Sequence, residues 1–142
     1  IDAEIEKNSG MTINDIFASY GETRFRDMET EEIKKISKMK NLIISTGGGA
    51  VLREENMKAL SESGTIVCLW AGPETILKRT ASTNDRPLLQ VDDPLGKIKG
   101  LLEKRRPYYE KADIMIDTEN KSPFGIAEEI LQKTRERDEK TP

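Results

Sequence analysis

The stretch LIISTGGG, residues 42–49, is a short apolar run followed at once by three glycines. Two similar apolar runs lie further along the chain, IVCLW at 66–70 and IMI at 114–116. All three runs are continuous rather than alternating, which is typical of strands buried on both faces of a parallel sheet. They predict strands at 42–45, 66–70 and 114–116.

Helical patterns fill the sequence between these runs. Residues 12–15, Thr-Ile-Asn-Asp, resemble a capping box with Asp in place of Glu, and Gly21 marks the end of that helix. A second helical pattern runs from Glu22 to about Lys38. Prolines stand where the first turn of further helices accepts them, at 73, 94 and 123. Strands that alternate with helices indicate an α/β fold with right-handed crossovers.

Composition excludes several classes of function. The 142 residues carry 23 basic and 26 acidic side chains, a net charge of −3, and therefore no broad basic field for nucleic acid or an anionic membrane. Histidine is absent, which excludes Ser-His-Asp triads and His-ligated metal sites. The single Cys68 cannot form an internal disulfide and reads as a small buried hydrophobe in a reducing compartment. The sequence shows no secretory signal and no apolar run of membrane-spanning length, so we expect one cytoplasmic domain.

Three successive glycines after a strand have two interpretations. They expose three backbone N–H groups at the carboxyl end of a buried strand, where open α/β sheets bind ligands, and such a nest suits carboxylate or hydroxyl oxygens. Glycines in this position also serve simple tight turns. The residues alone leave both interpretations open.

Several charged residues are candidates for a site. Arg86 lies beside Pro87 in a polar loop, residues 81–93, where a mobile guanidinium could close over phosphates. Arg26 and Arg105 taken separately read as surface arginines. Asp2 reads as the N-cap of a helix. The acidic residues 29, 31 and 32 read as a solvated helix face without metal-ligand spacing.

Five motifs in this order resemble the shikimate kinase family. They are DxxIE at 2–6, IxxIFxxxGExxFRxxE at 13–29, ISTGGGAV at 44–51, RPLL at 86–89 and KRxPxY at 104–109. The resemblance implies a three-layer α/β/α domain over residues 1–142 with a parallel sheet, similar to the P-loop nucleoside-monophosphate kinases. It also implies transfer of the γ-phosphoryl group of ATP, with Mg²⁺, to the 3-hydroxyl of shikimate, in the pathway of aromatic amino-acid biosynthesis.

The resemblance also assigns roles to residues. It divides the chain into a substrate-binding region at about 2–60, a lid at about 81–93 and an adenine-side loop at about 118–123. Asp2 corresponds to the aspartate that binds the shikimate hydroxyls and accepts the proton of the attacking one. By the same resemblance, the pocket for the substrate carboxylate is formed by Arg26 and Arg105 with the backbone of Gly47, Gly48 and Gly49. The nucleotide is contacted by Arg86 and Asn120.

The chain departs from the family pattern at one place. No Gly-x-x-x-x-Gly-Lys-Ser/Thr phosphate-binding loop occurs in its 142 residues. We therefore expect the fold to lack the family's N-terminal strand, phosphate loop and helix, with a gap in its sheet and no metal ligand of its own, and we hypothesise that the sequence is part of a longer, monomeric protein. The alternatives are a module that binds shikimate without catalysis, and a gluconate-kinase-like enzyme for another hydroxylated acid.

Overall fold

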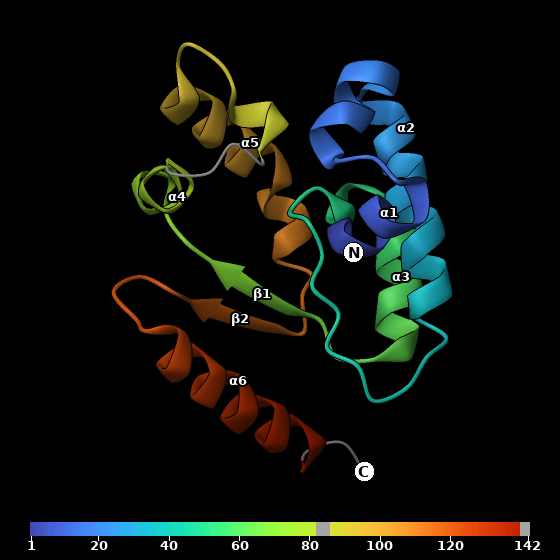
Figure 1. The fold of residues 1–142 in the computed structure, drawn as a ribbon. Coiled ribbons are helices and arrows are strands. Elements are labelled where there is room, and N and C mark those ends of the chain that lie inside the picture. The colour runs from blue at the N-terminus through green and yellow to red at the C-terminus, as the bar shows by residue number, and fades with distance from the viewer. Residues whose placement is uncertain (82–85, 140–142) are drawn as a thin grey trace.

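The computed structural model describes residues 1–81 and 86–139. Its elements are, in chain order, α1 (Asp2–Ser9), α2 (Ile13–Ile36), the 3₁₀ turn η1 (Ala50–Leu52), α3 (Glu54–Ser63), β1 (Val67–Trp70), α4 (Pro73–Thr80), the 3₁₀ turn η2 (Pro87–Leu89), α5 (Pro94–Tyr109), β2 (Ile114–Asp117) and α6 (Pro123–Asp138). Figure 1 shows α5 above the sheet and α6 below it. This layering confirms the predicted α/β/α fold class.

The sheet of the described residues has two parallel strands. β1 pairs with β2 in a register that places Val67 opposite Ile114 and Trp70 opposite Asp117. Ile114 and Ile116 are buried, whereas Leu69 on β1 is 55% exposed. The predictions at 66–70 and 114–116 are therefore confirmed to within one residue at each end.

The strand predicted at 42–45 is wrong. These residues belong to a connection between α2 and η1, and the side chain of Ile43 is fully exposed to solvent. A strand forms only when a neighbour satisfies its backbone N–H and C=O groups. No segment within 1–81 or 86–139 pairs with this one, so its apolar composition alone does not make it a strand.

Start and stop signals of the helices are largely confirmed. The hydroxyl oxygen of Thr12 accepts a hydrogen bond from the backbone N–H of Asp15 at 3.1 Å and caps α2. Gly21 ends the first helical segment as predicted: its φ of 77° and ψ of 174° are non-helical and make a kink, after which the second segment of α2 begins. Helices α4, α5 and α6 each begin with the predicted proline.

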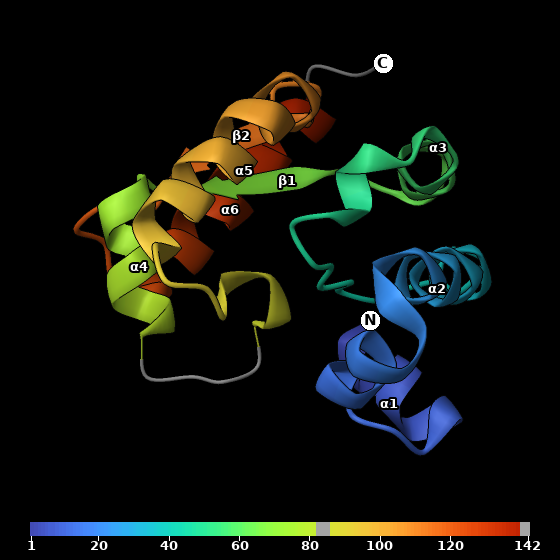
Figure 2. The ribbon, with the colours of Figure 1, turned by 90° about the horizontal axis from the view of Figure 1, so that it is seen from above.

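A small apolar core joins α1 to α2. It consists of Ile5, Ile13, Ile16 and Phe25, with Phe17 packed at its edge. The rings of Phe17 and Phe25 lie 4.8 Å apart, on either side of the bend in α2. Burying side chains of this size contributes roughly 1.5–3 kcal/mol each. Figure 2 shows the resulting unit, α1 beside α2, separated from the sheet by the segment that carries η1 and α3.

The sheet half of the molecule is less deeply packed. Helix α6 contributes no fully buried side chain, and Met115 on β2 is 37% exposed. Cys68 is half-buried rather than fully buried, and this burial raises the pKa of its thiol. Among the described residues, no helix combines the length and apolarity needed to cross a membrane.

Candidate functional site

The three glycines form a tight turn that we call the glycine turn, Gly47–Gly49. Its first carbonyl accepts a hydrogen bond from the N–H of Ala50 at 3.1 Å, and η1 continues from it. A Cβ atom at Gly47 would lie 3.3 Å from Oε1 of Glu29, and one at Gly49 would collide with the guanidinium of Arg26. Glycine is needed here because charged side chains approach the backbone closely.

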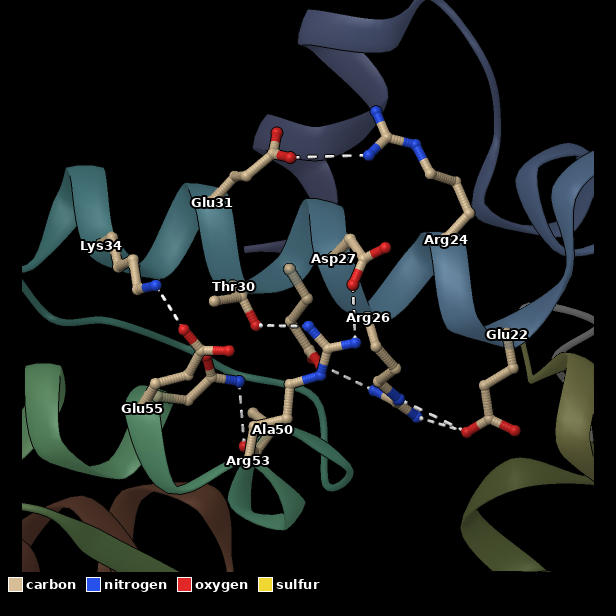
Figure 3. A network of polar contacts seen from close by, with 12 residues as sticks. Glu22, Arg24, Arg26, Asp27, Thr30, Glu31, Lys34, Ala50, Arg53 and Glu55 are labelled. Atoms are coloured by element: carbon tan, nitrogen blue, oxygen red, sulfur yellow. Dashed lines mark hydrogen bonds and ion pairs between the residues drawn. The ribbon is translucent and has the colours of Figure 1, made fainter.

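Arg26 on α2 is held by two carboxylates. Its Nη1 donates to Oε2 of Glu29 at 2.7 Å, and its Nη2 donates to Oε1 of Glu22 at 3.2 Å, as Figure 3 shows for Glu22. The guanidinium also lies over the ring of Phe25, 5.0 Å from the centroid. Charge-assisted hydrogen bonds of this kind fix both the position and the plane of the guanidinium.

Glu29 is fully buried, and its burial raises the pKa of its carboxyl group. The hydrogen bond and charge of Arg26 oppose this shift, the charge of Asp2 adds to it, and the charge of Arg105 opposes it. The charges of Asp2, Arg26 and Arg105 therefore all act on Glu29, although these residues lie on elements far apart in the sequence. We call these four residues the site cluster: Asp2, Arg26, Glu29 and Arg105.

The interpretation of residues 29, 31 and 32 as a solvated face is wrong for two of the three. Glu29 is 0% and Glu32 8% exposed, and only Glu31 lies open to solvent. Glu32 accepts a hydrogen bond from the amide of Asn8 at 3.0 Å, which ties α2 to α1. One signal was present in the sequence: Arg26 precedes Glu29 by three residues, the spacing at which helical side chains meet.

Helix α5 brings Arg105 and Tyr109 to the other side of the glycine turn. The Tyr109 hydroxyl donates to the carbonyl of Gly48 at 2.7 Å. A Cβ atom at Gly48 would lie 3.4 Å from Nη1 of Arg105, so that guanidinium borders the same glycine. The two residues stand four apart on the helix and therefore share one face.

Asp2 is not the N-cap that the sequence suggested. It is the first residue of α1, and Ile1 occupies the cap position without a side-chain hydrogen bond. Oδ1 of Asp2 is instead buried without a partner among the described residues. The carboxylate is therefore available to the site cluster rather than used by the helix.

Three buried polar atoms of the site cluster lack hydrogen-bond partners within the described chain: Oδ1 of Asp2, Oε1 of Glu29 and Nε of Arg105. Nearly all buried polar groups in proteins are hydrogen-bonded, so a concentration of exceptions calls for an explanation. Two acceptors and one cationic donor match a small ligand that carries hydroxyl groups and a carboxylate.

The predicted nucleotide contacts lie elsewhere. Arg86 is exposed at the N-cap of η2, and no hydrogen bond or ion pair within the described ranges joins its side chain to the site cluster. Residues 82–85 of the predicted lid lie outside the described part of the chain. Asn120 is exposed with a φ of 53° in the turn that follows β2, at the predicted adenine-side loop.

Sequence reasoning missed the contacts that hold this loop. Arg79 donates from Nη1 and Nη2 to the hydroxyl and carbonyl oxygens of Thr118, both at 2.8 Å. Glu119 accepts from the Thr75 hydroxyl and from the backbone N–H of Gly72, both at 2.6 Å. These two hydrogen bonds lower the pKa of the Glu119 carboxyl group. The start of α4 and the loop after β2 are thereby joined.

The residues that the structure describes do not fit a metal site. Within residues 1–81 and 86–139, no group of three His, Cys, Asp or Glu side chains could hold an ion. Asp2 and Glu29 are the acids of the site cluster, and Glu29 already accepts from Arg26. Two carboxylates, one of them in an ion pair, fall short of the oxygen-rich coordination that Mg²⁺ takes.

Comparison with known proteins agrees with this geometry. The family model described as shikimate kinase matches residues 1–135. The shikimate kinase of Thermodesulfovibrio yellowstonii is 52% identical over 133 residues, which cover 94% of this chain and 77% of that protein. That of Thermus thermophilus is 43% identical over 134 residues, covering 94% of this chain and 73% of that protein.

Solved structures give the same result. A shikimate kinase from Acinetobacter baumannii, in complex with shikimate, superposes with a TM-score of 0.93 at 37% identity and covers 99% of this chain and 78% of that one. The shikimate kinase of Aquifex aeolicus superposes with a TM-score of 0.82 at 38% identity, covering 96% and 80%. With its fold, its motifs and its match over residues 1–135, the chain belongs to the shikimate kinase family.

Proposed function

We propose that this protein transfers the γ-phosphoryl group of ATP to the 3-hydroxyl of shikimate. The observation that carries the proposal is the site cluster at the glycine turn, in which three buried polar atoms lack partners among the described residues. Shikimate carries one carboxylate and three hydroxyl groups, and those are the groups that two arginines and a free carboxylate oxygen recognise. The relative from Acinetobacter baumannii was solved in complex with shikimate.

We assign the substrate carboxylate to Arg26 and Arg105. Two guanidiniums offer paired, planar N–H donors to a carboxylate, a geometry that lysine cannot copy. The pre-positioned Arg26 and the buried, unpartnered Nε of Arg105 support this assignment. Backbone N–H groups of the glycine turn, Gly47–Gly49, border the same space and complete the carboxylate pocket in this proposal.

We assign the hydroxyl groups of the substrate to Asp2. Its unpartnered Oδ1 supports a role in orienting the 3-hydroxyl and in accepting its proton. In this step the 3-oxygen forms a bond to the γ-phosphorus, the bond from that phosphorus to the β–γ bridging oxygen breaks, and the proton passes to Asp2. Phosphoryl transfer depends on position and charge stabilisation, so it does not require histidine.

We assign the nucleotide to the lid and the loop after β2. Arg86 would contact the ATP phosphates from residues 81–93, and Asn120 would border the adenine from residues 118–123. The cationic side chain of Arg86 and its exposure at the start of η2 support the first assignment. Mg²⁺ enters the proposal only as the counter-ion of the ATP phosphates.

The test is a titration of the purified protein with shikimate and with ATP by calorimetry, followed by a coupled kinase assay. Arg26→Ala and Arg105→Ala should each cost about 2–4 kcal/mol of shikimate binding, because each removes half of a charge-assisted clamp. Arg24→Ala is the matched control, since Arg24 lies on the same helix in an exposed pair with Glu31. Unchanged shikimate affinity in both clamp variants would sink the assignment.

The same experiment separates the alternatives. A module without catalysis would release heat with shikimate, none with ATP, and form no phosphorylated product. A gluconate-kinase-like enzyme would phosphorylate gluconate faster than shikimate. The absence of a Gly-x-x-x-x-Gly-Lys-Ser/Thr loop from residues 1–142 favours the module without catalysis when these residues are assayed alone, whereas no feature of the described residues favours gluconate over shikimate.

We also propose that residues 1–142 form one domain that acts as a monomer in the cytoplasm. The close packing of α1, α2, η1 and α5 around one site supports a single unit. Light scattering on a size-exclusion column should give the mass of one chain, and a mass of two chains would overturn the monomer.

A further inference from the structure

We propose that Arg53 is a positioning residue that fixes the glycine turn against helix α2 and thereby sets the place of Arg26 and Glu29 at the site. Arg53 itself does not touch the substrate in this proposal. The expected effect on shikimate binding rests on the proposed function. The effect of Arg53 on the position of the glycine turn can be tested without a substrate.

The side chain of Arg53 bridges two elements that are far apart in the sequence. Arg53 follows η1 directly and occupies the N-cap position of α3. Its Nη2 donates to Oδ1 of Asp27 at 2.7 Å, and its Nη1 donates to the hydroxyl oxygen of Thr30 at 3.2 Å. Figure 3 shows both contacts crossing from η1 to α2. Thr30 is 5% exposed, so the contact reaches into the protein.

Arg53 contacts two residues of α2, and each of them directly follows a residue of the site cluster. Asp27 follows Arg26, and Thr30 follows Glu29. Residues three apart on a helix share a face, and each residue is rotated by about 100° from the one before it. One rigid guanidinium that binds at two points along α2 therefore fixes the rotation of the helix, and with it the direction of the neighbouring face.

The other end of this link is the glycine turn itself. The backbone N–H of Arg53 donates to the carbonyl of Ala50 at 3.4 Å, and the amide of Asn56 donates to the same carbonyl at 3.1 Å. The N–H of Ala50 in turn donates to the carbonyl of Gly47 at 3.1 Å. Arg53 is thus attached to the glycine turn through a short, hydrogen-bonded 3₁₀ turn.

The chain provides a matched control for this link. Lys34 and Glu55 form an ion pair that also joins α2 to the segment after η1, and Figure 3 shows it further along the helix. Both side chains are about half exposed, 51% and 48%; in the Arg53–Asp27 pair Asp27 is 45% exposed, whereas Arg53 is 27% exposed and also reaches the buried Thr30. Exposed ion pairs contribute little to stability. Glu55→Gln should therefore alter the connection between the same elements without moving the site.

The experiment compares Arg53→Ala, Arg53→Lys and Asp27→Asn with Glu55→Gln in two independent measurements. The first is steady-state kinetics, where Arg53→Ala should raise the KM for shikimate about tenfold while kcat and the KM for ATP stay within about twofold. Arg53→Lys should recover only part of this loss, because one ammonium group cannot reproduce two fixed N–H directions. Asp27→Asn should follow Arg53→Ala in direction even if the alanine variant folds poorly.

The second measurement needs no substrate. Oε1 of Glu29 lies against Gly47, so a displaced glycine turn would admit water to this carboxyl group. Carbon-detected NMR titration of Glu29 should then show its pKa moving toward the ordinary value in Arg53→Ala and not in Glu55→Gln.

The outcomes separate this inference from the proposed function. A rise in the KM for shikimate together with a changed Glu29 titration, both absent in Glu55→Gln, supports the inference. An Arg53→Ala variant with the wild-type Glu29 titration and the wild-type KM for shikimate overturns the inference. A variant that loses kcat, ATP affinity and melting temperature as much as shikimate affinity also overturns it, because that pattern indicates a merely structural residue. A wild-type protein that ignores shikimate while Arg53→Ala still shifts the Glu29 titration overturns the proposed function and leaves the positioning role supported.

Discussion

The two arginines at the glycine turn are held in opposite ways. Arg26 on α2 donates to the carboxylates of Glu22 and Glu29, whereas Arg105 on α5 keeps a buried Nε that has no partner among the described residues. The protein itself fixes the place of Arg26, while the Nε–H of Arg105 keeps no partner among the described residues. Under the proposed function, the Arg26 side of the site is pre-organised, and the Arg105 side would complete its hydrogen bonds on binding.

This difference explains why a carboxylate is buried at the site. A buried ion pair is weak support for stability, because the loss of hydration of two charges offsets their attraction. Glu29 shows that cost directly, since burial raises its pKa in spite of the ion pair with Arg26. The pair adds little to stability as a whole, but it orients Arg26, and removing one partner alone would leave the other charge buried.

Replacing Glu29 with Ala should produce the largest effect. The change leaves Arg26, which is 11% exposed, without its closest partner, and should lower the free energy of unfolding by about 3–5 kcal/mol. Glu31→Ala is the control, because its exposed pair with Arg24 should matter by about 1 kcal/mol or less. Equal urea midpoints for the two variants would show that Glu29 holds Arg26 no more strongly than Glu31 holds Arg24.

Replacing Gly49 with Ala tests the close approach on the α2 side. The added methyl group collides with the guanidinium of Arg26, and overpacking of this kind costs about 1–3 kcal/mol in unfolding free energy. Gly100→Ala on α5 meets open space and should instead stabilise the protein by about 0.5–1 kcal/mol. Urea denaturation of both variants checks the pair, and a neutral Gly49→Ala would show that Arg26 moves freely.

Replacing Tyr109 with Phe tests the α5 side by removing one hydroxyl group. The carbonyl of Gly48 loses its donor, which should cost about 1 kcal/mol of stability and weaken shikimate binding severalfold. Tyr108→Phe is the control, because its more exposed ring stands beside Lys111 and away from the turn. Thermal unfolding and calorimetry on both variants should separate them, and identical behaviour would make the Tyr109 contact irrelevant.

The smallest effect is expected at Glu119, outside the site cluster, and it depends on pH. Hydrogen bonds from Thr75 and Gly72 hold the pKa of Glu119 below its ordinary value of 4.5. A lowered pKa contributes stability above pH 4.5, and this contribution is lost as the pH falls through the lowered value. Glu119→Gln should therefore melt below the wild type at pH 7, with a gap that closes in acid.

The control for this prediction is Glu103→Gln, an exposed change on α5. Its melting temperature should follow that of the wild type across the same pH range. A Glu119→Gln gap that persists unchanged well below pH 4.5 would contradict the role given to the carboxylate charge.

The sequence was sufficient for the fold class and for the family, whereas the roles given to the site residues stay predictions. Ordered motifs identified Asp2, Arg26 and Arg105, and the structure brings these three side chains around Glu29. Proline and glycine positions predicted the helix starts and the end of the first helical segment at Gly21, because both residues act through local backbone geometry.

The remaining features depend on contacts between distant segments. The run at 42–45 has strand composition, yet a strand also needs a partner that composition does not supply. Glu29 differs from Glu31 in the sequence only by its spacing from Arg26 and its place in the motif at 13–29, and its burial against the glycine turn depends on packing between distant segments. Arg53 and Asp27 lie 26 residues apart, so their ion pair leaves no local signal.

Trp70 gives the protein an intrinsic fluorescence signal close to the glycine turn. It is the only tryptophan of the chain, and its ring lies 6.4 Å from that of Tyr109, whose hydroxyl binds the glycine turn. The guanidinium of Arg106 covers the indole at 5.7 Å. Indole emission responds to neighbouring charge and polarity, so intrinsic fluorescence should report any change in the position of Tyr109 or Arg106 when shikimate is added. The protein carries its own label for binding.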